Sequence, residues 1–243
     1  MKKALIIGGI ALGVLLSAVI VIFIFFPGLL TYLKVKHDYG SLNRHITEFQ
    51  MAEPSDSFCE YEANGLSYKV PAGWLTENNR SFKSTDGHST FLALKQNLSF
   101  ELSYDPWESY KYSEEDYRKL FEKLGVEVPE YDLSTRILWL AKDKITAKDC
   151  LKLRGKNLKV FRELAEIKNE AWDLENSWVI YGEGFTAYVG QMRSNGYDGN
   201  MWTVTVYPDS SKLTKYFVTI NTPDKKTARQ IISTIKLSSK ETE

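Results

Sequence analysis

The feature that most constrains this chain is an uncharged, strongly apolar run that begins at Ala4 and continues to Leu33. Its first part, Ala4–Phe26, holds 23 residues with Ser17 as the one polar interruption. A helix of that length rises roughly 34 Å, which is enough to cross a hydrocarbon core of about 30 Å. Helices in soluble cores are rarely apolar on every face. The sequence therefore predicts a transmembrane anchor over residues 1–33 that meets the lipid bilayer through residues 4–26.

A cleavable signal peptide is the alternative interpretation of the same run. Signal peptides carry an apolar region of about 7–15 residues, followed by small residues at the cleavage site. This run is longer, and its exit over Phe25–Tyr32 lacks an alanine-x-alanine pattern. No cysteine follows the run closely, so a lipoprotein anchor has no support either. We expect an uncleaved signal-anchor.

The positive charges beside the run predict its orientation. Lys2 and Lys3 precede it, and Lys34 and Lys36 follow it, so the two sides differ little. A very short N-terminal tail with two lysines is typical of a tail that stays in the cytoplasm. The prediction is a single-pass protein of the cell membrane, with the N-terminus inside and the C-terminal domain outside.

Small residues recur every four positions within the anchor, at Gly9, Gly13 and Ser17. This spacing places them on one face of a helix, where they let a second helix approach closely. Glycine and serine are common in membrane helices, so the spacing can also be incidental. The candidate role of this face is homodimerisation.

Composition beyond the anchor is that of an ordinary globular protein. The chain has 243 residues, of which 43% are hydrophobic and 26% charged, and its formal net charge is zero. A nucleic-acid-binding protein would show a concentrated basic surface, so nucleic acid is not an expected partner. We expect a stalk over residues 34–57, a folded domain over 58–237 and a charged tail over 238–243.

Turn signals and alternation predict β-strands at the start of the domain. Asn64-Gly65 separates Phe58–Glu62 from Leu66–Val70, which is typical of a tight hairpin. A second hairpin is expected around Gln96-Asn97, with its second strand over Leu98–Tyr104. There apolar and polar residues alternate with the period of a sheet that has one wet face.

The pattern then changes to helices over residues 113–174. Ser113 and Thr146 each precede an acidic residue by three positions, which is a helix-capping arrangement. Strands return from Trp178 to Ile220, and Thr222 with Pro223 is expected to cap a last helix. Strands, helices, strands and helix in that order predict an α+β domain with an antiparallel sheet and a helical insertion.

Two stretches together resemble bacterial extracytoplasmic domains of the PsbP-like fold, named for an extrinsic photosystem subunit. One is the hairpin Asn64–Val70 with its exit Pro71-Ala72-Gly73-Trp74, and the other is the strand Lys215–Ile220 followed by Ala228–Ile235. The resemblance implies an antiparallel sheet sandwiched by helices and a binding or assembly role without catalysis. The helical subregion 113–174 departs from this pattern by its length. A fold alone does not fix a function.

The two cysteines, Cys59 and Cys150, show no CxxC spacing. A disulfide between them would close a loop of about 90 residues and could add roughly 4 kcal/mol in an oxidising compartment. Two separately buried thiols are the alternative. With three histidines in the chain, zinc-ligand spacing is missing, and we predict no metal site.

No stretch carries a recognised catalytic motif, such as a phosphate loop, a nucleophile elbow or a HExxH pair. We therefore predict no catalytic residue and no cofactor. Trp107 is the best candidate for an exposed aromatic contact, because the other tryptophans fall mostly at apolar positions. The leading hypothesis is a membrane-anchored binding or assembly domain whose partner is another membrane or envelope protein. The alternative is an envelope-acting hydrolase with a site assembled from distant residues.

Overall fold

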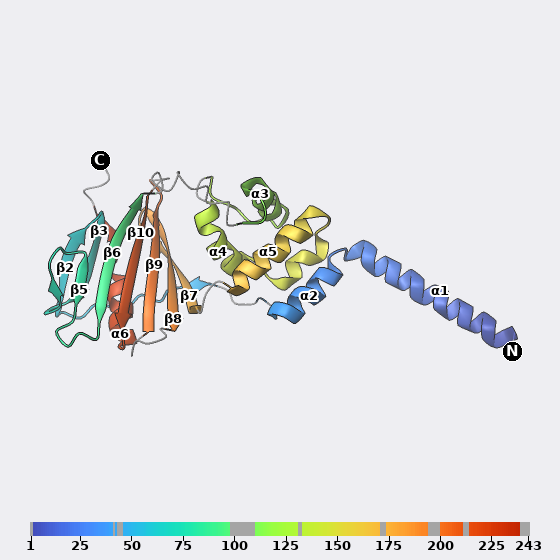
Figure 1. Ribbon diagram of the computed structural model, residues 1–243, viewed down its shortest axis with the longest axis horizontal. Helices are drawn as coiled ribbons and strands as arrows, with labels where there is room; N and C mark the ends of the chain where they lie inside the picture. The colour runs from blue at the N-terminus through green and yellow to red at the C-terminus, as the bar shows by residue number, and fades with distance from the viewer. Residues whose placement is uncertain are drawn as a thin grey trace.

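The computed structural model describes residues 2–40, 42, 46–97, 110–130, 133–170, 174–193, 200–210 and 214–238, with side chains in the first helix described from Gly13 on. It is an α+β structure in three parts (Figure 1): a β-rich part, a helical part beside it, and one long helix that projects away from both.

The helices lie at the N-terminus, in the middle of the chain and near its C-terminus. Their bounds are α1 Lys2–Phe25, α2 Leu29–Tyr39, α3 Glu114–Lys123, α4 Leu133–Lys144, the 3-10 helix η3 Ala147–Lys152, α5 Lys156–Glu170 and α6 Lys225–Ser233. The strands are β1 Thr47–Glu48, β2 Phe58–Ala63, β3 Leu66–Pro71, β4 Leu75–Thr76, β5 Ser81–Lys83, β6 Thr90–Asn97, β7 Leu174–Gly182, β8 Phe185–Arg193, β9 Asn200–Pro208, β10 Thr214–Thr222 and β11 Lys236–Leu237.

The described strands form two sheets. The large sheet has the order β1-β7-β8-β9-β10-β6-β5-β4, and the small sheet has the order β11-β3-β2. All pairs are antiparallel except β1 with β7, which is parallel. The antiparallel expectation is therefore corrected to a mixed large sheet with a small second sheet beside it.

The hairpin predicted around Asn64-Gly65 is confirmed as β2 and β3. Asn64 and Gly65 have φ values of 56° and 82°, the left-handed backbone that a two-residue hairpin turn of this type needs. In β3, the side chains of Leu66, Tyr68 and Val70 are fully buried, while the intervening residues are partly exposed. One face of the small sheet therefore packs into the core.

The second predicted hairpin is wrong at its turn. Gln96 and Asn97 belong to β6 and pair with Lys215 and Thr214 of β10. The other edge of β6 is occupied by β5, so β6 has two strand neighbours already. The expected partner strand, Leu98–Tyr104, lies outside the described residues.

The core of the β-rich part lies between the large sheet, the small sheet and α6. Phe82, Phe91, Trp202 and Ile231 are among its buried members. On α6 the apolar residues recur at helical spacing, so that Ala228, Ile231 and Ile232 all face the sheets. Asp224 caps this helix by accepting from the Lys226 backbone N–H at 2.9 Å, where the sequence suggested Thr222. The correction is small, because the capping residue moves by two positions.

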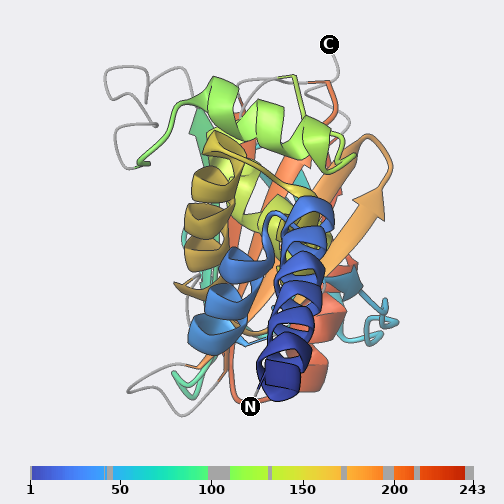
Figure 2. The same ribbon diagram turned by 90° about the vertical axis from the view of Figure 1, so that its right-hand side faces the viewer.

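The helical part has a separate core. Tyr117, Phe121, Ile137, Phe161 and Leu164, from α3, α4 and α5, are fully buried there. Val35 of α2 joins the same core with 1% of its surface exposed. The view from the α1 end (Figure 2) shows these helices in front of the large sheet. The helices between residues 114 and 170 thus form a core of their own, which α2 completes.

Described residues within the expected stalk, 34–57, contribute to the cores and to the large sheet, which a free stalk would not do. Phe49 is 4% exposed and belongs to the core of the β-rich part. The segment after β1 runs along α6, where Arg229 and Gln230 donate to the carbonyls of Gln50 and Glu53 at 3.1 and 2.7 Å. The mixed polar composition that suggested a linker reflects an edge strand and its extension, which expose one side to solvent.

Candidate functional site

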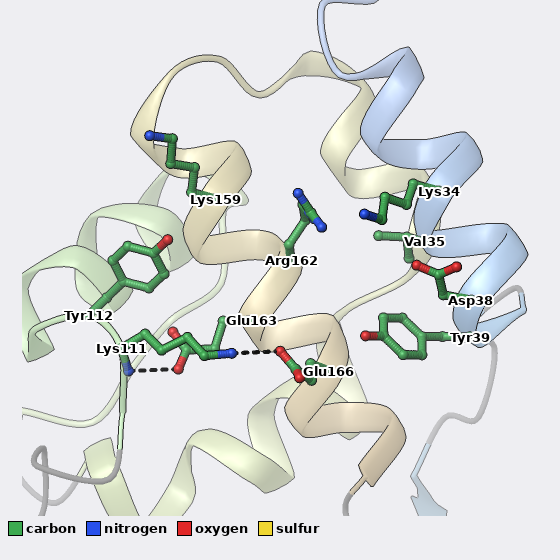
Figure 3. Close-up of a pocket in the computed structure, with 10 residues that line it drawn as sticks. All are labelled: Lys34, Val35, Asp38, Tyr39, Lys111, Tyr112, Lys159, Arg162, Glu163 and Glu166. Carbon is green, nitrogen blue, oxygen red and sulfur yellow. Dashed lines mark hydrogen bonds and ion pairs between the residues drawn. The ribbon is translucent and has the colours of Figure 1, made fainter.

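A cleft with a polar lining lies between α2 and α5 and has a volume of about 300 Å³ (Figure 3). Two helices and one short segment line it. Those lining residues are Lys34, Val35, Asp38 and Tyr39 of α2, Lys159, Arg162, Glu163 and Glu166 of α5, and Lys111 with Tyr112. We call it the cationic cleft, for the reasons given next.

The carboxylates of the cleft already have partners. Glu166 Oε2 accepts from Lys111 Nζ at 2.9 Å, and Glu163 Oε1 accepts from the Lys111 backbone N–H at 2.7 Å. Asp38 Oδ1 lies 2.9 Å from Nδ1 of His37. Glu163 and Glu166 therefore hold the segment at Lys111 against α5, whereas Asp38 contacts its chain neighbour on α2.

Three cations of the cleft remain without such partners. Within the described part of the chain, no carboxylate lies within ion-pair distance of Lys34, Lys159 or Arg162. Figure 3 shows Lys34 reaching from α2 toward Arg162 on α5, with the Tyr39 hydroxyl turned toward the same space. Like charges facing one another across a cleft repel, and an anion between them would relieve that repulsion.

Glu163 ties the cleft to the helical core behind it. It is 7% exposed and lies beside the buried Tyr117 and the partly buried Tyr110, whose ring centroids are 5.7 Å apart. Burial and the neighbouring Glu163 carboxylate raise the pKa of both Tyr110 and Tyr117. Both tyrosines therefore stay neutral at physiological pH. They support Glu163 from the core side of the cleft by packing and add no charge to it.

The cleft has the groups of a binding site and lacks the usual nucleophiles. No serine, threonine, cysteine or histidine is among its lining residues. Among the described residues, no group of three or more His, Cys, Asp or Glu side chains is arranged to hold a metal ion. Guanidinium and ammonium groups with tyrosine hydroxyls match an anionic oxygen ligand, such as a phosphate or a carboxylate.

A second hollow of about 380 Å³ lies at the β4–β5 edge of the large sheet. Leu75, Phe82 and Lys83 are among its lining residues. Leu75 is 65% exposed there. The hollow presents one lysine and one glutamate, so its charge is balanced and it carries no comparable ligand preference.

The two cysteines are not joined. Cys59 lies exposed on β2, whereas Cys150 is fully buried in η3, and both thiols are free. Cys150 Sγ lies 3.1 Å from the Ala147 carbonyl oxygen. The disulfide expectation is therefore corrected, because one cysteine belongs to the small sheet and the other to the helical core.

The remaining predicted site residues are placed as follows. Gly9, Gly13 and Ser17 all fall on α1, and Ser17 Oγ donates to the Gly13 carbonyl at 2.9 Å. A side chain added at Gly13 would meet nothing within 4 Å, so that position faces open space. Trp107 lies outside the described residues. Gly9, Gly13 and Ser17 are not among the lining residues of the cationic cleft.

Sequence reasoning missed the cleft, although the chain holds a signal for it. Between Lys148 and Arg162 there are six basic residues and one acidic residue, Asp149. The zero net charge of the whole chain hides this local excess. A scan of local charge would have found the basic segment that contains Lys159 and Arg162. It could not have shown that Lys34 lies across from that segment in the fold.

No protein-family model matches this sequence, and no curated protein matches it significantly.

Proposed function

We propose that this chain is a single-pass membrane protein whose α+β domain lies outside the cytoplasm and binds another membrane or envelope component without catalysis. The resemblance to PsbP-like domains is in keeping with such a role and stays a prediction. The cationic cleft adds that the bound component presents anionic oxygen groups.

The observation that carries the proposal is the exposure of α1. From Val14 to Phe26 its large apolar side chains are each at least 40% exposed, with Phe25 at 68%. Because they occupy successive positions, they point in all directions around the helix. Figure 1 shows that this helix projects from the rest of the chain. Such a surface in water would be strongly unfavourable, at roughly 25 cal/mol per Å² of apolar area.

The length of α1 and its bend against α2 both bear on the membrane crossing. No single helix, taken over its described side chains, is long and apolar enough to cross a membrane; Gly13–Phe25 and Leu29–Tyr39 satisfy that requirement as a pair, bent by 76°. The helix α1 as a whole holds 24 residues. With Ala4–Phe26 as the apolar stretch, the proposal assigns the crossing to α1 and leaves α2 at the membrane surface.

The native Cys59 provides the test of topology. Intact cells that express the chain are treated with a membrane-impermeant maleimide, and Cys59→Ser is the control. We expect labelling of the wild type in intact cells, because Cys59 is exposed and Cys150 is buried. Labelling that appears only after lysis would place the domain in the cytoplasm and end the extracytoplasmic proposal.

Binding is tested by placing a photo-crosslinker at Lys159, on the cleft, and at Lys83, on the opposite part of the molecule. A specific adduct in membranes from Lys159 and none from Lys83 is expected. Equal or absent adducts at both positions would count against a partner at the cleft.

A further inference from the structure

The sharp bend between α1 and α2 determines how far the residues of α2 are spread along the axis of α1. At 76° to α1, each residue of α2 advances only about 0.4 Å along the α1 axis, compared with 1.5 Å along its own axis. The eleven residues Leu29–Tyr39 therefore stay within about 4 Å of one depth. If α1 crosses the bilayer, which is the proposed function on which this inference rests, α2 lies within one headgroup layer.

The two faces of α2 suit that position. Its inner face packs Val35 into the helical core, with Tyr32 and Tyr39 beside it. Its outer face carries Leu30 and Leu33, which are 65% and 52% exposed. Apolar side chains on the outer face and lysines at its margins are the pattern of a helix that lies in a membrane interface.

Hydrogen bonds connect the helical part to the C-terminal end of α1, next to the bend. Arg154 Nη2 donates to the Ile24 carbonyl at 3.1 Å, and the Gly28 N–H donates to the Leu151 carbonyl at 3.1 Å. The segment 150–156 therefore lies beside the end of α1. Exposed Lys152 and Lys156 flank Arg154, and Lys156 also pairs with Asp116 at 2.7 Å.

The cationic cleft opens within this layer. Lys34 is five residues beyond Leu29, which places it about 2 Å from Leu29 along the α1 axis. Arg162 faces Lys34 across the cleft, and Lys159, one turn earlier on α5, lines the same hollow with its ammonium turned away from Lys34 (Figure 3). These three cations, which have no carboxylate partner among the described residues, lie in the cleft that opens beside α2.

We propose that the cationic cleft binds the headgroup phosphates of anionic phospholipids, with Lys34, Lys159 and Arg162 as the phosphate-binding residues and α2 lying in the headgroup layer. Basic groups near an anionic membrane surface each strengthen binding, and salt weakens that attraction. The helical part is thus a membrane-surface module that fixes the β-rich part relative to the bilayer.

The experiment uses the full chain in lipid nanodiscs of phosphatidylcholine alone or of phosphatidylcholine with phosphatidylglycerol. Hydrogen exchange of the α2 amides is the readout. We expect exchange to slow about tenfold in the discs with phosphatidylglycerol, and high salt to reverse this. The variant Lys34→Gln/Lys159→Gln/Arg162→Gln should lose the difference. The matched control Lys83→Gln/Lys225→Gln/Lys226→Gln changes charge equally on the β-rich part and should keep it.

The outcomes separate this inference from the proposed function. Failure of the chain to enter either kind of disc would overturn the anchor and the inference together. Insertion with equal exchange in both discs would leave the anchor standing and overturn the lipid site. Equal protection by inorganic phosphate added to phosphatidylcholine discs would overturn the lipid as the source of the phosphate.

Discussion

Trp139 of α4 stacks on Tyr188 of β8, with ring centroids 5.1 Å apart and ring planes within 5° of parallel. This contact lies between α4 of the helical part and β8 of the large sheet. Trp139 forms a small third cluster with Ile46 and Val179, and Met192 packs against it. Arg136, one turn earlier on α4, lies over the Tyr207 ring at 4.3 Å.

Replacing Trp139 with alanine should therefore loosen the helical part from the large sheet. We expect Trp139→Ala to lower the free energy of unfolding by about 3 kcal/mol, as for other buried aromatic truncations. Trp139→Phe keeps a ring and should lose less than half of that. Thermal unfolding of the full chain in detergent, followed by near-ultraviolet circular dichroism, measures both. An unchanged midpoint in Trp139→Ala would show that the stacking contributes nothing.

Gly28 should tolerate no side chain, because it lies against the backbone of η3. A Cβ at Gly28 would fall 1.8 Å from the Cys150 carbonyl oxygen, which cannot move without the 3-10 helix. We expect Gly28→Ala to destabilise the chain by about 2 kcal/mol. The control is Gly13→Ala on α1, where an added Cβ meets nothing within 4 Å and should change stability by less than about 0.5 kcal/mol. Equal midpoints for the two variants would refute the close approach.

Lys168 should make stability depend on pH. Burial, and then the Lys142 charge, lower the pKa of Lys168 from 10.5 to about 8 in the fold, while its ammonium donates to the Lys142 carbonyl at 3.1 Å. Between those two pH values the unfolded chain binds the proton more tightly than the folded chain does. The contribution of Lys168 to stability therefore rises as pH increases from about 8 toward 10.5.

Between pH 7 and pH 9 this amounts to about 1 kcal/mol. We expect the wild type to gain that much relative to Lys168→Met, with urea unfolding measured at both pH values. Lys159→Met, an exposed lysine on the same helix, should follow the wild type. Parallel pH profiles for the wild type and Lys168→Met would show that Lys168 has an ordinary pKa in the fold.

The two thiols should differ strongly in reactivity. Burial raises the pKa of Cys150 to about 12, so its thiolate is scarce at pH 8 and reagents cannot reach it. Intact mass spectrometry after maleimide treatment without reductant should show one rapid addition, at Cys59, and a second only after denaturation. Two unreactive cysteines in the denatured chain would instead reveal a disulfide.

The small-residue face of α1 predicts a homodimer that depends on close helix approach. Gly13→Leu should abolish chemical crosslinking of two copies in membranes, because the leucine separates the helices. Leu15→Ile, away from that face, should leave crosslinking unchanged. A chain that crosslinks equally with Gly13→Leu does not use this face.

Local signals allowed much of the fold to be predicted from sequence. The Asn64-Gly65 turn and the Ser113 and Thr146 caps determine structure within a few residues, and each is found in place. The arrangement of the strands in the sheet was harder to predict. The turn expected at Gln96-Asn97 fails because β6 pairs with β10, more than a hundred residues away, and such pairings leave no local pattern.

The candidate site could not be predicted for a related reason. Its cations come from α2 and α5, which are separated by more than a hundred residues and meet only through the helical core. The mixed polar composition of residues 34–57, with Gly40, Pro54 and three serines, predicts a stalk. Leu42, Ile46 and Phe49 are nevertheless buried, each against a different cluster.

The pairing of β1 with β7 has a consequence for the order of folding. Thr47 and Glu48 emerge early in synthesis, yet their partners Trp178 and Val179 follow about 130 residues later, and the α6 residues that hold the next segment come later still. The segment around Thr47 and Glu48 therefore has no strand partner until almost the whole chain has been made. A chain released early would leave the edge of β7 or the β1 segment unpaired, and unpaired strand edges favour aggregation.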